Sequence, residues 1–408
     1  MRILLWHGYL LGGTGSNVYT RALAREWSLA GHDVTVVCQE RHPERYDLGG
    51  ACVVVPELPG GLLPTFVLDR YEGLEARLLG DFTEAEREAY VEANAAALRE
   101  LAPADLVFAN HVLLGAPVGA ASGMRYRVKA HGSELEYAMR GRPDLAQWGA
   151  ETLAEAEVVY AGSEHIREVL DDVCGHVDRV EIVPPGVDVD EFRPEPREEA
   201  LPSLIDEARR DPGDGDERHP DTGNAERFAE FFARDEPTVV YFGKLMENKG
   251  VHVLLEALPG LDARAVVVGF GDYREQLEAL APPGTLFTGA LEHRHLRHLL
   301  PLCDVAAVPS IFPEAFGMVA AEAAAAGVLP VVSAHSGLAE VAAGIGEEVG
   351  PDVAPLLSFP AGESAALRKR LAGILTLPAE RRRELGLAAR RAVERRWSWN
   401  VVADRLLA

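Results

Sequence analysis

The sequence of 408 residues is poor in cysteine and in basic residues, and each shortage excludes a class of protein. Its four cysteines stand far apart with no CxxC spacing, so neither a zinc site nor a disulfide framework is expected, and a reducing cytoplasm is the predicted location. Lysine and arginine number 40 against 64 acidic residues, a net charge of −24. Such a chain repels nucleic acid and anionic membranes, and any phosphate that it binds needs a local basic site.

Long apolar runs and repeats of fixed period are also missing. No uninterrupted apolar stretch reaches about 18 residues, so no membrane span is predicted. The opening "MRILLWHGYLLGG" lacks the h-region and cleavage site of a signal peptide and predicts a buried strand instead. Apolar residues nevertheless make up 48% of the chain, enough for two domains with a core each.

Runs rich in Val, Ile and Leu alternate with helix-like stretches such as residues 16–31, which is typical of parallel sheets built from βαβ units. The sequence therefore predicts an α/β protein with two Rossmann-like, doubly wound domains that face each other across a cleft. The strand-like runs span residues 2–8, 33–39, 105–111, 126–132, 158–162, 180–186, 237–244, 263–271, 284–290, 304–310 and 328–334.

Domain boundaries follow from a change of composition in the middle of the chain. Residues 191–236 are acidic, hold several Pro and Gly, and predict a linker or insert that is partly helical or mobile. An N-terminal domain is predicted over 1–190 and a C-terminal domain over 237–390. Ligands of such domains bind at the carboxyl ends of the strands, where each of the candidate motifs below lies.

The glycine-rich turn "GYLLGGTGSNVYT" follows the first predicted strand. Gly12, Gly13 and Gly15 allow the backbone to approach a phosphate or a sugar closely. One alternative is a dinucleotide fingerprint with Glu40 as the ribose-binding acid, although its third glycine position falls on Val18. The other alternative is an ordinary flexible turn.

Two lysines follow the first strand of the second domain in "YFGKLMENKG". Lys244 and Lys249 lie five positions apart, and two ammonium groups that converge on a diphosphate would offset its charge without a metal. The alternative is a solvated loop with ordinary lysines.

The stretch "PEAFGMVAAEAAAAG" predicts a helix that begins near Gly317, with Glu314 ahead of it and Glu322 in its middle. The amides of Phe316, Gly317 and Met318 are then unpaired and suit an anion. Glu314 could accept hydrogen bonds from sugar hydroxyls and Glu322 from ribose hydroxyls, since a buried carboxylate needs partners. A structural partner for Glu322, such as an arginine, is the alternative.

These motifs together resemble the retaining glycosyltransferases of family 4, which have the GT-B fold. "PEAFGMVAAEAAAAGVLPVV" is similar to the E-x7-E signature of the family, and "GTGSNVYTRALAREWSLAGHDVTVV" to its N-terminal block. "IVPPGVDVDEF", "VVYFGKLMENKG" and "HSGLAEV" resemble three further motifs. The resemblance covers nearly the whole chain apart from the region around 196–236. It also implies that a last helix, here 391–408, returns to the N-terminal domain.

The resemblance implies that Glu322 holds the ribose of the donor nucleotide and Glu314 the donor sugar, while the two lysines neutralise the diphosphate. Lys244 replaces the usual arginine of the family. The base is usually held by backbone near "TGALEHR", and UDP is favoured over GDP or ADP. The predicted donor-binding residues are Gly13, Gly15, Lys244, Lys249, Leu291, Glu314, Ala315, Phe316, Gly317, Met318 and Glu322.

His131 in "VKAHGSELEY" matches a family histidine that lies near the donor sugar and the acceptor. Arg125, Arg127, Lys129 and His131 alternate, so in a regular strand they share one face. Either the early arginines belong to a loop, or Lys129 and His131 line an anionic acceptor pocket. His111 lines the same pocket or is structural. The predicted acceptor-binding residues are Asn17, His111, Lys129 and Ser133, and the predicted catalytic residues are His131, Glu314, Lys244 and Lys249.

The predicted function is retaining sugar transfer from a nucleoside-diphosphate sugar to a hydroxyl acceptor, with no cofactor and no metal. The leaving diphosphate, as the resemblance implies, takes the proton of the acceptor. Asp188-x-Asp190 resembles a metal motif but lies in the interdomain segment. A soluble acceptor is favoured over a lipid because the helix-like stretch 84–100 is acidic. Membrane association and nucleic acid are not expected as partners, and a homodimer is allowed.

Three alternatives remain at this point. An NAD oxidoreductase would leave the motifs of the second domain without a role. A non-catalytic sugar-nucleotide sensor would not need Glu314 or His131. A phosphorylase or an epimerase on the same fold is the nearest alternative.

Overall fold

The structure, a computed structural model, describes residues 1–67, 71, 73–211 and 218–408. Contacts between residues divide the chain into two compact units. Unit 1 consists of residues 1–185 and 402–408, and unit 2 of residues 186–401. The sequence predicted the first boundary at 190 and the start of the returning segment at 391.

Unit 1 is built on a parallel sheet of seven strands in the order β3-β2-β1-β6-β7-β8-β9. All six strands predicted for this half are present, while β3, only three residues long, was missed because so short a run gives no pattern. The strands are β1 (Arg2–Trp6), β2 (Asp33–Val37), β3 (Cys52–Val54), β6 (Leu106–Asn110), β7 (Tyr126–Lys129), β8 (Val159–Ala161) and β9 (Val180–Ile182). A separate parallel pair joins β4 (Leu62–Thr65) to β5 (Glu75–Leu78).

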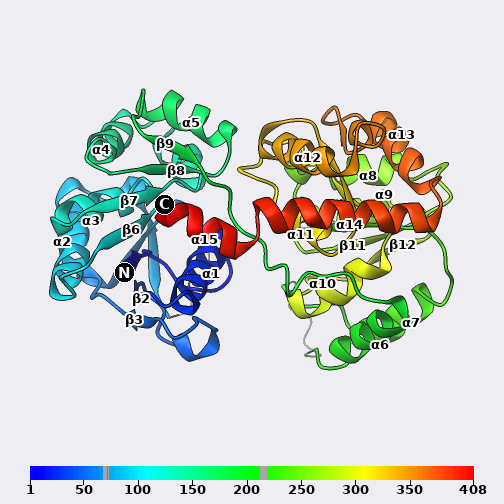
Figure 1. Cartoon of the computed structure of the whole chain (residues 1–408), viewed down its shortest axis with the longest axis horizontal. Coiled ribbons are helices and arrows are strands. Elements are labelled where there is room, and N and C mark those ends of the chain that lie inside the picture. Colours follow the sequence, from blue (N-terminus) through cyan, green and yellow to red (C-terminus); the bar gives the residue numbers. More distant parts are fainter. Residues whose placement is uncertain (68–70, 72, 212–217) are drawn as a thin grey trace. The chain divides into compact units, whose positions relative to one another are not determined.

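Helices connect these strands, as a parallel sheet requires. The helices of this unit are α1 (Gly15–Leu29), α2 (Glu84–Glu100), α3 (Gly115–Ser122), α4 (Pro143–Leu153) and α5 (Glu164–Cys174), with a π-helical turn at Glu134–Met139 (Figure 1). Thr83 begins α2 with a capping box, because its hydroxyl accepts from the amide of Glu86 while the Glu86 carboxylate accepts from the amide of Thr83.

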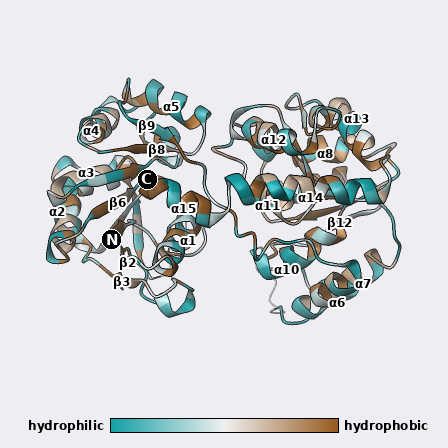
Figure 2. Ribbon diagram, in the orientation of Figure 1, coloured by the Kyte–Doolittle hydropathy of each residue, from teal (hydrophilic) through white to brown (hydrophobic). Residues whose placement is uncertain are grey.

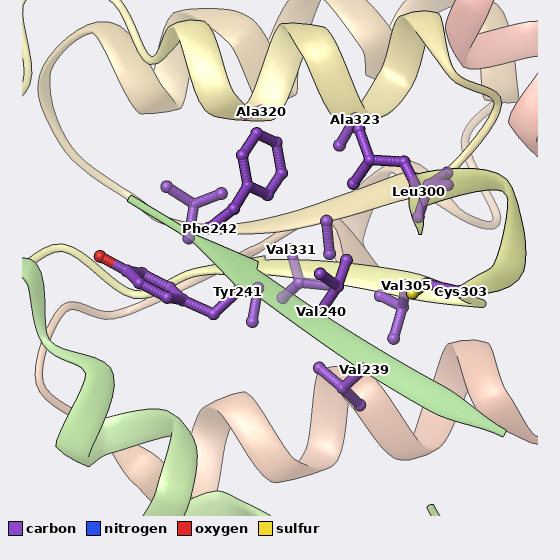
Figure 3. Close-up of a cluster of buried hydrophobic side chains, with 14 of the residues drawn as sticks. Val239, Val240, Tyr241, Phe242, Leu300, Cys303, Val305, Ala320, Ala323 and Val331 are labelled. Atoms are coloured by element: carbon purple, nitrogen blue, oxygen red, sulfur yellow. The ribbon is translucent and has the colours of Figure 1, made fainter. Parts of the chain in front are cut away.

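Unit 2 holds a second parallel sheet, in the order β12-β11-β10-β13-β14-β15. The strands are β10 (Thr238–Phe242), β11 (Arg264–Val268), β12 (Thr285–Phe287), β13 (Val305–Val308), β14 (Leu329–Ser333) and β15 (Ser358–Phe359). Figure 3 shows Val240 and Phe242 of β10 in one buried cluster with Val331 of β14 and the alanines Ala320 and Ala323. The strands of both sheets are largely apolar (Figure 2) and their residues are mostly buried, which confirms the predicted buried runs.

The helices of unit 2 include two that belong to the predicted insert. They are α6 (Arg197–Ala208), α7 (Asn224–Phe231), α8 (Val251–Ala257), α9 (Arg274–Leu280), α10 (His293–Leu299), α11 (Met318–Ala325), α12 (Ser336–Val349), α13 (Ser364–Leu375) and α14 (Ala379–Arg396). Leu204 of α6 and Phe228 of α7 are fully buried in the core of this unit. The described part of the insert is therefore a packed part of unit 2.

Helix α15 (Trp399–Leu407) carries the chain from unit 2 back to unit 1. In unit 1, the indole nitrogen of Trp27 donates to the carbonyl oxygen of Ala403 at 3.0 Å, and Arg127 donates to that of Leu406 at 2.8 Å. These bonds tie residues 402–408 to the rest of the unit.

Within the described residues, no helix is both long enough and apolar enough to cross a membrane.

Candidate active site

Helix α11 begins at Met318, one residue after the predicted start, and a turn at residues 309–317 leads into it. Gly317 has a φ of +108°, and a Cβ atom there would lie 2.6 Å from Leu338 Cδ2. The turn therefore needs glycine at this position. In the part of the chain that the structure describes, the amides of Phe316, Gly317 and Met318 meet no hydrogen-bond acceptor, and Ala315 directly precedes them. These unpaired amides are suited to an anion.

Glu314 is fixed from both its backbone and its side chain. Its amide donates to the hydroxyl of Ser336 at 2.9 Å, and its carbonyl accepts from the amide of Gly337 at 3.1 Å. Its carboxylate accepts from Lys249 Nζ at 2.6 Å, in a pair whose side chains are 23% and 31% exposed. The structure thus brings together two of the predicted catalytic residues. Ser336, at a φ of +50°, is a positioning residue that the sequence did not single out.

Lys244 lies just after β10 with an exposed side chain. The hydroxyl of Tyr241 donates to the carbonyl of Lys244 at 2.7 Å and so holds its backbone. Among the described residues no carboxylate pairs with the ammonium group of Lys244. That leaves its positive charge without a carboxylate partner there, and its contact with a diphosphate stays a prediction.

Glu322 lies in the second turn of α11. Burial raises the pKa of its carboxyl group; His293 opposes this shift and Glu191 adds to it. Its carboxylate forms no hydrogen bond or ion pair within the described residues, so the predicted structural partner is not found there. Leu291, a predicted donor contact, is partly buried and packs its side chain against the core of the unit. His293 and Glu191 were missed because nothing in the sequence relates them to Glu322.

In unit 1, the glycine-rich turn runs into α1, whose first residue is Gly15. Gly13 has a φ of +92°, a conformation that favours glycine. At Gly15 a Cβ atom would meet nothing within 4 Å, so the structure itself does not demand glycine at that position. Both residues are exposed at the start of a helix, where the predicted approach to a diphosphate stays a prediction.

Asn17 was predicted to contact the acceptor, and the structure corrects this. The side chain is 2% exposed, its amide nitrogen donates to the carbonyl of Gly12, and its oxygen accepts from His7 Nε2 at 2.8 Å. Because the nitrogen of Asn17 has an acceptor, its oxygen must face His7. Asn17 therefore positions His7 and the glycine-rich turn, and does not face an acceptor.

The hydrogen-bond network around His131 defines its protonation. Asn110 donates from Nδ2 to the carbonyl of Trp6 and to the hydroxyl of Thr20, so its oxygen must accept. His131 Nε2 lies 2.7 Å from that oxygen and therefore carries the hydrogen, which leaves Nδ1 as an acceptor. Burial, with help from His111, holds the pKa of His131 well below its ordinary value. The neutral ring thus offers a lone pair to a ligand hydroxyl.

Glu134 organises the residues that follow β6 and β7. One oxygen accepts from the amides of His131 at 2.9 Å and Val112 at 3.2 Å, and the other lies 3.3 Å from His111 Nδ1. Burial alone raises the pKa of Glu134, but His111 and the amide of His131 outweigh it, and the net pKa is lowered. Ser133 contacts the same carboxylate at 3.5 Å. The sequence did not assign Glu134 a role, although it follows His131 by three residues.

Lys129 does not line an acceptor site, contrary to one of the predicted alternatives. Its side chain is 2% exposed and its ammonium group donates to the carbonyl of Val183 at 2.6 Å. Arg127, two residues earlier, points to the same face of β7 and contacts Leu406. Arg127 and Lys129 therefore meet the carbonyls of Leu406 and Val183 and not a ligand, while the exposed Arg125 pairs with Glu157.

Burial lowers the pKa of Lys129 to about 7. Between that value and the unfolded value near 10.5, the unfolded chain binds more protons than the folded chain, so the free energy of unfolding should rise with pH. We expect Lys129→Met to remove this rise, which is at most about 1.4 kcal/mol per pH unit. Urea unfolding at pH 7, 8 and 9 measures it. The exposed Lys369→Met is the control, and parallel pH profiles for wild type and Lys129→Met would contradict the expectation.

Comparison with known proteins places this geometry in context. Residues 13–191 match the model of the family described as "Glycosyltransferase Family 4", and residues 223–392 match that described as "Glycosyl transferases group 1". Together the two matches include every predicted catalytic, donor-binding and acceptor-binding residue.

Two curated relatives carry activities in their names. A GDP-mannose-dependent alpha-(1-6)-phosphatidylinositol monomannoside mannosyltransferase of Mycobacterium tuberculosis is 29% identical over 304 residues, 70% of this chain and 69% of that protein. A D-inositol 3-phosphate glycosyltransferase of Xylanimonas cellulosilytica is 32% identical over 282 residues, 65% of this chain and 60% of that protein.

Solved structures share the fold. Sucrose-phosphate synthase of Thermosynechococcus elongatus superposes with a TM-score of 0.70 at 20% identity, over 99% of this chain and 97% of that one. Anabaena HepE, solved in complex with UDP and glucose, gives a TM-score of 0.70 at 17% identity, over 100% and 98%. The predicted GT-B fold is confirmed.

Proposed function

Because the chain belongs to glycosyltransferase family 4, and is thus a retaining enzyme that takes its sugar from a nucleotide sugar, we propose that it moves a hexose from a nucleoside-diphosphate sugar to a hydroxyl acceptor. The observation that carries this proposal is a set of polar groups around α11 that are suited to bind a nucleotide sugar. It combines the unpaired amides of residues 316–318, the Lys249–Glu314 pair and the unpartnered carboxylate of Glu322.

Each of these groups has a proposed task. The carboxylate of Glu322 accepts hydrogen bonds from the ribose hydroxyls, and Glu314 accepts them from hydroxyls of the donor sugar. Lys249 and Lys244 then neutralise the diphosphate together with the helix amides. In unit 1, the lone pair of His131 accepts a bond from a sugar hydroxyl.

In the proposed reaction the bond between the anomeric carbon and the diphosphate oxygen breaks as the acceptor oxygen bonds to the same face of that carbon. The proton of the acceptor passes to the departing diphosphate. The residues contribute position and electrostatic stabilisation of the negative charge that develops on the diphosphate. The two lysines are therefore proposed to assist the departure of the diphosphate.

Two lines of evidence bear on which nucleotide the donor carries. The sequence alone favours UDP, whereas the Mycobacterium tuberculosis relative is GDP-mannose-dependent by name. Similarity in sequence is the closer guide to a ligand than similarity in fold, so we rank GDP-mannose first and UDP sugars second. Location in the cytoplasm, a soluble acceptor and a homodimer stay predictions.

A thermal-shift screen without added metal tests the proposal. The panel contains NAD, NADP, UDP, GDP, ADP and the corresponding nucleotide sugars. We expect one nucleoside diphosphate and its sugars to raise the Tm, because a ligand that binds only the folded chain stabilises it. A shift with NAD alone would overturn the proposal, and a nucleotide-sugar shift without nucleotide release in the presence of acceptors would favour a sensor.

A further inference from the structure

Five aromatic side chains form one buried group in unit 1, which we call the histidine cluster: His7, Tyr9, Phe66, His111 and His131. The ring of His111 lies at its centre. Its centroid is 4.6 Å from that of His131, 5.1 Å from Phe66, 5.5 Å from Tyr9 and 5.8 Å from His7. His7 and Tyr9 follow β1, His111 follows β6 and His131 follows β7, so the cluster lies at the carboxyl ends of neighbouring strands, where ligands bind in such sheets.

Three buried polar atoms of the cluster, His7 Nδ1, the hydroxyl of Tyr9 and His111 Nε2, have no hydrogen-bond partner in the described part of the chain. His111 Nδ1 faces the ionised carboxylate of Glu134 and therefore carries the hydrogen, so Nε2 presents a lone pair. That Nε2 atom and the hydroxyl of Tyr9 are both buried without a hydrogen bond. Hydroxyl groups of a ligand would satisfy both kinds of atom, because a hydroxyl can donate to Nε2 and can accept from Tyr9.

The backbone at His111 supports a functional role. Its φ is +73°, in the left-handed region that residues other than glycine rarely adopt. Strained conformations of this kind persist where the surroundings hold them and are concentrated at ligand sites. Here the amide of His111 donates to the carbonyl of Lys129 at 2.8 Å, which holds the ring in the cluster.

The charge around the cluster points to the class of ligand. The carboxylate of Glu134 is the charged group in contact with it. Lys129 is the nearby cation and acts on His131 and Glu134 through its charge, but its ammonium group is already bonded to the carbonyl of Val183. Within the described residues, no hydrogen bond or cation–π contact joins a lysine or an arginine to the five rings. A phosphate here would meet the carboxylate of Glu134 without a cation bonded to it, which is costly in a buried place.

We propose that the histidine cluster binds an uncharged, hydroxyl-rich part of the acceptor, with His111 Nε2 accepting a hydrogen bond from one of its hydroxyls and Tyr9 donating one. The inference rests on the proposed function, since it names the acceptor class of the same reaction. It replaces the predicted alternative of an anionic acceptor at Lys129 and His131.

Two variants isolate these contacts. Tyr9→Phe deletes a hydroxyl that has no hydrogen-bond partner among the described residues, so it should leave the Tm unchanged or raise it. His111→Asn keeps a donor for Glu134 and tolerates a positive φ, but it lacks the Nε2 position. Tyr126→Phe is the control, because the Tyr126 hydroxyl bonds to Thr152 away from the cluster.

The assay follows nucleoside-diphosphate release from GDP-mannose and UDP-glucose with matched acceptor probes. The pairs are glucose and glucose 6-phosphate, fructose and fructose 6-phosphate, and myo-inositol and its 1-phosphate. We expect the uncharged member of a pair to be the better acceptor. Its KM should rise about three- to tenfold in Tyr9→Phe and in His111→Asn, as for a lost hydrogen bond, and stay unchanged in Tyr126→Phe.

Three results would overturn the inference: preference for the phosphorylated probes, no turnover of any uncharged probe, or an unchanged KM in Tyr9→Phe with a raised Tm. The last would mean that the cluster holds only water. Calorimetric titration of GDP and UDP into the same preparations distinguishes a failure of this inference from a failure of the proposed function. If GDP or UDP binds but one of the three results above is found, the proposed acceptor contact of the histidine cluster is wrong and the proposed function stands. If neither nucleotide binds, the proposed donor site is wrong.

Discussion

Replacing Glu322 with glutamine is expected to weaken nucleoside-diphosphate binding by about 10- to 100-fold, the effect of weakened hydrogen bonds to a charged acceptor. The carboxylate has no protein partner in the described residues, and the proposed ribose hydroxyls would supply two donors. Calorimetric titration of GDP and UDP into the wild type and the variant measures the difference. Equal affinities would contradict the ribose role.

The same substitution should raise the free energy of unfolding of the ligand-free protein. Burial raises the pKa of Glu322, so the folded state binds more protons than the unfolded state above pH 4.5, and the charged form lowers stability as pH rises. Glutamine removes that penalty. We expect the gain in urea unfolding at pH 7 and not at pH 4. Glu256→Gln, exposed on α8, is the control and should change neither quantity.

Replacing Glu314 with alanine is expected to lower kcat by about 100- to 1,000-fold, the loss typical of a contact that stabilises the transition state. The affinity for the nucleoside diphosphate should stay the same or increase. In the ligand-free protein Lys249 Nζ lies 2.6 Å from Glu314 Oε1, so removal of the carboxylate frees the ammonium group for the diphosphate. Steady-state kinetics and calorimetry on one preparation measure both quantities.

Lys249→Met is the complementary variant, and the exposed Lys369→Met is its control. Lys249→Met should weaken binding of the nucleoside diphosphate. In the double variant Lys249→Met/Glu314→Ala, the gain in diphosphate affinity expected for Glu314→Ala alone should disappear. A double-mutant cycle reports this coupling. A loss of nucleotide affinity in Glu314→Ala as large as its loss of kcat would show that Glu314 binds the nucleotide and not the transferring sugar.

The strands were predictable because a buried parallel strand needs a continuous apolar run, and each of the eleven predicted runs contains a strand. β15, with two residues, leaves no such trace. Glu314 and Lys249 could each be identified from local motifs. Their contact could not, because it joins residues 65 positions apart.

The errors have one physical origin, which is that burial and partners are decided by distant parts of the chain. Lys129 was read as facing a ligand, yet its ammonium group meets Val183, which is 54 residues away. Asn17 was placed at the acceptor, but its oxygen faces His7. Alternation along a strand predicts which side chains share a face, and it does not predict what covers that face.

The packing of the insert also depends on residues outside it. Its acidic composition predicted a linker or insert that is partly helical or mobile, and its described part holds the helices α6 and α7, which pack against the core of unit 2. Arg294 of α10 holds it there through Glu207 at 3.0 Å and Asp211 at 2.6 Å. Part of the acidic charge of the insert is therefore used in ion pairs that attach it to α10.

Residues 402–408 complete unit 1 although residues 186–401 separate them from the rest of it. During synthesis the ribosome must therefore add all of unit 2 before Trp27 and Arg127 can reach their carbonyl partners. At about 5–20 residues per second that delay lasts roughly ten seconds or longer. Over this time the nascent first unit exposes the surface that residues 402–408 later cover, so unit 1 reaches its final packing only after the second unit has been translated.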